Sequence, residues 1–131
     1  MGRTARARRA TTTAGRLALL LGASGVMHLV RPRTFDRIVP AALPARATTY
    51  ASGAAEIAIA VGLAVPRTRR IAGLAAAALF VAVFPANLTM ARDLLDDPSS
   101  PRPMRVIALL RLPLQLPLVG WALGVGRHAR P

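Results

Sequence analysis

Two ionisable side chains stand inside otherwise apolar stretches of this chain. Glu56 lies in the stretch 47–66, and Arg111 lies in the stretch 106–126. A charge in an apolar environment costs several kcal/mol unless it has a partner, so we expect Glu56 and Arg111 to form an ion pair. The sequence leaves two roles open for such a pair. It is either a structural ion pair that fixes the packing of two helices, or a group that binds a proton or a ligand.

Neutral polar side chains occupy the same kinds of stretches. Ser52 precedes Glu56 by four residues and Gln115 follows Arg111 by four, so each pair shares one helix face. At about 1.5 Å of rise per residue, both charges fall in the outer half of the membrane, and so do His28, Asn87 and Gln115. The alternative for the neutral residues is plain bonding between helices. The sequence predicts one intramembrane polar cluster, made of Glu56, Arg111, Asn87, Gln115, His28 and Ser52.

Several kinds of catalytic and metal site are excluded by residue type. The chain has no Cys, which excludes thiol chemistry, disulfides and cysteine-ligated clusters. Its two histidines, His28 and His128, are far apart in the sequence, so we expect no bis-histidine haem and no metal site. Phosphate-loop, dinucleotide and HExxH motifs do not occur. We therefore expect no catalytic residues, the residues themselves indicate no cofactor, and the interpretation leans away from an enzyme.

The elements that position the cluster must be transmembrane helices. The chain has 131 residues, of which 53% are hydrophobic, and none of its apolar stretches shows strand alternation. A helix needs about 20 residues to cross a hydrocarbon core of about 30 Å. The sequence predicts an all-α, four-helix transmembrane bundle with helices near 12–30, 47–66, 70–91 and 105–126. These helices form one domain, 12–126, between an Arg-rich tail, 1–11, and a short tail, 127–131.

Two other interpretations of the apolar stretches compete with this prediction. A soluble bundle requires a charged stripe on each helix, which the stretch 71–91 does not offer. A cleaved secretory signal remains the alternative for the first stretch, because Arg residues precede it.

Prolines and connections add detail to the predicted bundle. Pro85, Pro113 and Pro117 flank the polar amides and predict bent helices with unbonded carbonyl oxygens nearby. The segment 66–70 is short enough only for a tight turn, and the segment 32–44 is expected to lie in the outer membrane interface.

The charge distribution predicts an orientation. The net charge is +13, and all 18 basic residues are Arg. They lie beside the apolar stretches rather than on a recognition element, so no nucleic-acid partner is expected. With the N-terminus in the cytoplasm, the inner segments hold ten Arg and the outer segments seven. The positive-inside rule then places both termini in the cytoplasm.

Short motifs around the polar residues are similar to those of a known family. These motifs are His28 followed by Pro32-x-x-Phe35, Ser52-Gly53-x-x-Glu56, Phe84-Pro85-Ala86-Asn87 and Arg111-Leu112-Pro113-Leu114-Gln115. Together they resemble the DoxX-like family of small bacterial integral membrane proteins, over residues 17–126. The resemblance implies a four-helix protein of the bacterial plasma membrane. Relatives are associated with a terminal quinol oxidase or with thiol and oxidative-stress redox systems, and none supplies a catalytic residue that can be placed on this chain.

Three hypotheses about function follow. The first is an accessory subunit that binds a membrane or periplasmic redox protein. Quinone is the one cofactor that this hypothesis includes. The second is a non-enzymatic structural or lipid-interacting membrane protein, for which the lipid bilayer is the partner. The third is a proton- or solute-conducting unit, suggested by broken helices and intramembrane charges.

Overall fold

Residues 2–130 are described by the computed structural model, and their regular structure is helical throughout. Four helical stretches are long and apolar enough to cross a membrane, and the third of them consists of α4 and α5 together. The predicted all-α, four-helix transmembrane bundle is confirmed. The helices are α1 (Arg3–Val30), α2 (Pro32–Asp36), α3 (Ala45–Ala64), α4 (Arg69–Ala82), α5 (Phe84–Asp96) and α6 (Arg102–His128).

The first helix begins earlier than the sequence predicted. α1 starts at Arg3 rather than near residue 12, because Ala and Arg are strong helix formers and prolong the helix into the Arg-rich segment. Its 28 residues measure about 42 Å, about 12 Å more than a hydrocarbon core of about 30 Å. One end of α1 therefore extends into the head-group region.

Proline affects the third and fourth stretches differently. Pro85 lacks the N–H that would bond the carbonyl of Val81, and the helix breaks at Val83 into α4 and α5, where the sequence predicted one bent helix over 70–91. α6 instead passes through Pro113 and Pro117 without interruption. The break lets α5 leave the direction of α4 and follow α6.

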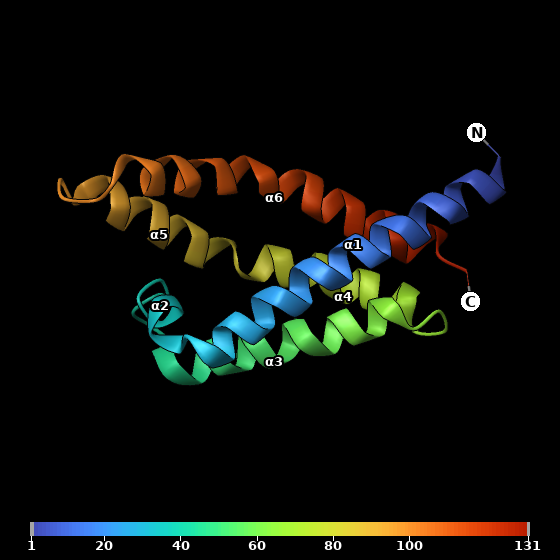
Figure 1. The fold of residues 1–131 in the computed structure, drawn as a ribbon, viewed down its shortest axis with the longest axis horizontal. Coiled ribbons are helices and arrows are strands. Elements are labelled where there is room, and N and C mark those ends of the chain that lie inside the picture. Colours follow the sequence, from blue (N-terminus) through green and yellow to red (C-terminus); the bar gives the residue numbers. More distant parts are fainter. Residues whose placement is uncertain (1, 131) are drawn as a thin grey trace.

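The helices are arranged as two arms that diverge toward one end (Figure 1). One arm is α1 packed on α3, and the other is α6 packed on α4 and then on α5. The chain termini and the α3–α4 turn lie at one end of the molecule, while α2 and the α5–α6 loop lie at the other. We call these the terminal end and the α2 end. Near the α2 end the arms separate, and α2 lies between them.

Glycines allow the helices within each arm to approach closely. A Cβ atom on Gly25 of α1 would lie 2.7 Å from the backbone oxygen of Gly53 on α3. A Cβ atom on Gly73 of α4 would lie 2.7 Å from the backbone nitrogen of Gly126 on α6. Small residues at such crossings are typical of helix association in membranes, where close packing replaces the hydrophobic effect.

Many of the large apolar side chains point outward. Leu19, Leu116 and Ile71 are 77%, 77% and 74% exposed, whereas core positions such as Ala14 and Ala76 are completely buried. This distribution is the one expected of a bundle surrounded by lipid, with small residues where helices meet.

Candidate functional site

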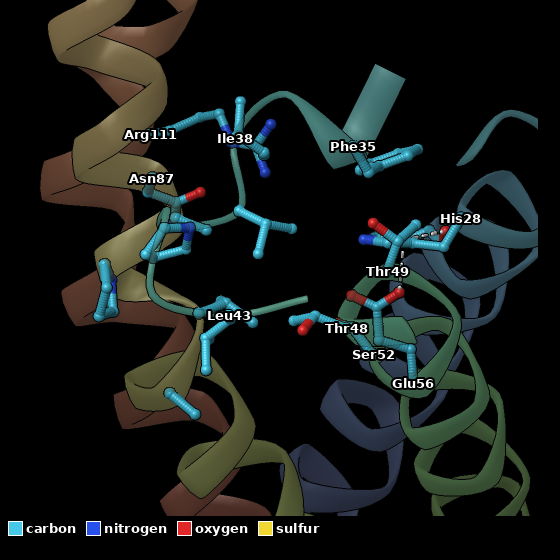
Figure 2. Close-up of a pocket in the computed structure, with 17 residues that line it drawn as sticks. His28, Phe35, Ile38, Leu43, Thr48, Thr49, Ser52, Glu56, Asn87 and Arg111 are labelled. Carbon is cyan, nitrogen blue, oxygen red and sulfur yellow. Dashed lines mark hydrogen bonds and ion pairs between the residues drawn. The ribbon is translucent and has the colours of Figure 1, made fainter. Parts of the chain in front are cut away.

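A cavity of about 180 Å³ lies between the two arms near the α2 end. Figure 2 shows Asn87 and Arg111 on the wall formed by α5 and α6, with Glu56 and His28 on the opposite wall formed by α3 and α1. Apolar side chains of α2 and the loop after it close the cavity, and they include Phe35, Ile38 and Leu43.

Five of the six predicted cluster residues line this cavity. The sixth, Gln115, lines an adjoining cavity of about 370 Å³ together with Glu56, Asn87 and Arg111. The structure therefore brings all six predicted residues to one joined site. The five in the first cavity are His28, Ser52, Glu56, Asn87 and Arg111.

The carboxylate of Glu56 meets His28, one helix away. Nδ1 of His28 lies 3.1 Å from Oε2 of Glu56 and 2.8 Å from the backbone oxygen of Ser24. The carbonyl of Ser24 can only accept, so Nδ1 of His28 carries a hydrogen and donates it to this carbonyl, while Oε2 of Glu56 lies beside the same N–H. Glu56 is only 6% exposed, and its Oε2 has no well-aligned hydrogen bond from any described residue. A buried carboxylate oxygen is thus left with capacity for another donor.

The predicted ion pair between Glu56 and Arg111 is wrong. Within residues 2–130, Arg111 forms no ion pair, and its guanidinium instead lies 3.9 Å from the sulfur of Met90. The physical reason is the divergence of the arms: the Gly25–Gly53 crossing brings α1 against α3, while α6 follows α5 to the other wall. Glu56 therefore takes its partner from α1, and Arg111 faces it across the cavity.

This correction changes which residues are energetically coupled. We expect the stability losses of Glu56→Gln and His28→Gln to be strongly non-additive, because the two side chains are in contact. The stability losses of Glu56→Gln and Arg111→Met should be closer to additive. Thermal unfolding of the single and double variants in detergent measures both couplings, and a larger coupling for the Arg111 cycle would contradict the observed pairing.

The two amides bond to each other between α5 and α6. Nδ2 of Asn87 donates to Oε1 of Gln115 over 3.4 Å, and both residues are buried. The other amide end, Nε2 of Gln115, has no hydrogen-bond partner in the described part of the chain. The sequence alternative of plain interhelical bonding is therefore observed for this pair, with one donor still unused.

An ion pair fixes the segment that covers the cavity. Nε of Arg46 lies 2.8 Å from Oδ2 of Asp36, joining α2 to the start of α3, and the ring of Phe35 stacks on His28 at 3.7 Å. The nearby Thr49 hydroxyl, together with the Arg46 guanidinium, holds the pKa of Asp36 below its ordinary value. The segment that covers the cavity is thus attached to α1 through Phe35 and His28, and to α3 through Asp36 and Arg46.

Thr49 is the site residue that the sequence prediction missed. It is 1% exposed, lines the cavity, and its Oγ1 has no partner with good geometry among residues 2–130. Its spacing from Ser52 and Glu56, three and then four residues, places all three on one face of α3. That spacing is the feature of the sequence from which Thr49 could have been predicted as a site residue.

Fold and site together define a class: a small, all-α, multi-pass membrane protein with a polar cavity between two helical arms. Residues 17–126 match the family described as a domain of unknown function, DUF8561, and the chain belongs to that family. No curated protein and no solved structure matches the chain.

Proposed function

We propose that this protein binds the ring of a membrane-soluble quinone or quinol in the cavity between its arms. The observation that carries the proposal is Glu56, a 94%-buried carboxylate with an unused oxygen beside an apolar-capped cavity. A quinol hydroxyl can donate to this oxygen. At the opposite edge of the same flat ring, Arg111 and Asn87 offer donors to a second oxygen. A few polar groups within an apolar pocket are typical of a small-molecule site.

The adjoining cavity supports a ligand with an apolar tail. Apart from its polar residues it is lined by aliphatic and aromatic side chains, among them Leu20, Phe80 and Leu114. Leu20 and Leu114 are 48% and 52% exposed, so this lining reaches the outer, lipid-facing surface of the bundle. A tail can leave the polar site by this route into the bilayer.

The chain is proposed as an accessory binding subunit rather than as the whole redox system. Its resemblance to DoxX-like proteins supports this role, and we propose membership in that wider group. Without Cys the chain cannot exchange thiols itself. We therefore assign electron transfer to a membrane or periplasmic redox protein that binds alongside it.

A binding experiment tests the proposal directly. Protein purified in mild detergent is titrated with a short-tailed quinone, its quinol, and an alcohol of the same tail length. We expect both quinone forms to raise the melting temperature and the alcohol to leave it nearly unchanged, because the polar cavity recognises the ring. Equal shifts with all three compounds would reject a ring site.

The location is proposed to be the bacterial plasma membrane, with both termini cytoplasmic, and labelling tests it. Because the chain has no native Cys, single cysteines at Ser99 and Thr68 report opposite ends of the bundle. In intact cells an impermeant maleimide should label Ser99→Cys and spare Thr68→Cys until the cells are opened. The reverse pattern would place the termini outside.

A further inference from the structure

The terminal end of the bundle carries a concentration of positive charge that no acidic residue offsets. An open hollow of about 500 Å³ there is lined by Arg8 of α1, Arg69 of α4 and Arg130 of the C-terminal segment, with Thr12 and Pro66. Every Asp and Glu of the chain lies elsewhere: in α2, midway along α3, or at the α2 end of α5 and directly after it. No Asp or Glu side chain therefore supplies a counter-charge for this hollow.

One of these arginines is held in a fixed position. Nε of Arg69 donates to the carbonyl of Leu63 over 2.9 Å, and a terminal nitrogen donates to the carbonyl of Ala64 over 3.1 Å. These bonds satisfy the end of α3 and keep the guanidinium at the rim of the hollow. A pre-positioned charge loses little side-chain entropy when an anion binds.

An apolar groove continues from the hollow along the bundle. It runs between α1 and α3, its lining is apolar apart from Thr12 and Arg16, and Thr12 lines the hollow as well. Glycine and alanine make it concave: Gly15, Ala18 and Gly22 on α1 face Ala60 and Ala64 on α3. From Thr12 to Val26 the groove extends about 21 Å at 1.5 Å per residue, which exceeds the depth of one leaflet, about 15 Å.

The depth of the hollow matches the head groups of a bilayer. If Val30 marks one edge of a core of about 30 Å, the other edge falls about 20 residues earlier, near residue 10. Arg8 then lies at head-group level, and the groove begins just inside the hydrocarbon. Basic pockets at this level are known to bind the phosphates of anionic lipids.

We propose that the hollow and groove form a binding site for one anionic phospholipid of the adjacent leaflet. Its phosphate lies among Arg8, Arg69 and Arg130, and one acyl chain follows the groove between α1 and α3. This site is separate from the cavity at the α2 end, so it stands whether or not quinone binds there.

Native mass spectrometry of the full chain, released from micelles with defined lipids, tests this site. We expect phosphatidylglycerol to bind at least tenfold more tightly than phosphatidylcholine with the same acyl chains. The variant Arg8→Gln/Arg130→Gln should lose this preference. Arg130 lies outside the helices, so the single variant Arg130→Gln should leave the fold intact. It should reduce the lipid preference less than the double variant does.

Matched controls separate a built site from general attraction. Arg33→Gln/Arg102→Gln removes two exposed charges at the α2 end and should keep the lipid preference. Gly15→Leu should weaken phosphatidylglycerol binding several-fold by filling the groove, while Gly124→Leu, also in open space, should not. Equal losses in both double arginine variants, or displacement of the lipid by inorganic phosphate at equal concentration, would overturn the proposal.

Discussion

Replacing Glu56 by Gln is expected to weaken quinol binding by at least tenfold. The substitution keeps the size of the side chain and removes only its charge and one acceptor. A hydrogen bond to a charged group contributes about 1.5–3 kcal/mol, which corresponds to roughly 10- to 150-fold in affinity. Glu56 is buried and has an oxygen free for this bond, so water compensates little for its loss. Titration of the wild type and the variant with the short-tailed quinol gives the ratio of dissociation constants.

A second carboxylate serves as the control for this substitution. Asp93→Asn removes the same charge from an exposed position of α5 outside both cavities, so it should leave quinol affinity unchanged. Equal affinity of the wild type and Glu56→Gln would show that the carboxylate does not contact the ligand. A purely structural role, in which the contact with His28 fixes the packing of α1 and α3, would then explain Glu56 fully.

Adding one methyl group at Gly25 is expected to destabilise the protein by about 2 kcal/mol or more. The Cβ of Gly25→Ala would lie 2.7 Å from the backbone oxygen of Gly53 and 2.8 Å from Cγ1 of Ile57, so α1 and α3 must move apart. Overpacking of a close contact typically costs 1–3 kcal/mol, and here backbone atoms are involved. A shift of several degrees in the melting temperature in detergent would report the loss.

The same substitution elsewhere on α1 provides the comparison. A Cβ at Gly15 meets no atom within 4 Å, so Gly15→Ala should leave the melting temperature unchanged or raise it slightly. Because Gly25 also faces the Cβ of Glu56, Gly25→Ala should disturb the His28–Glu56 contact and lower quinol affinity. Similar melting temperatures for the two variants would show that the helices can separate without cost.

The fold and most of the site were predictable because lipid imposes simple rules. The length of the apolar stretches identified the four spans, and Pro85 indicated where the third span departs from a straight helix. The rarity of polar groups in apolar stretches identified the six cluster residues. The pairing within the cluster was not predictable, since it depends on which helices cross. The Gly25–Gly53 contact decides that Glu56 meets His28, and helix-face spacing within single spans carries no information about it.

The division into two arms bears on how the protein is made. Only the turn between α3 and α4 joins the arms in the chain, so ribosomal synthesis delivers α1, α2 and α3 before any residue of α5 or α6. The first arm already contains both members of the His28–Glu56 contact and the glycine crossing that supports it. Asn87 and Arg111 arrive later, and with them the second wall. During biogenesis the wall with His28 and Glu56 therefore forms first, and the wall with Asn87 and Arg111 completes the cavity afterwards. A nascent chain stalled after the first arm would present the carboxylate of Glu56 to the membrane with no cavity around it.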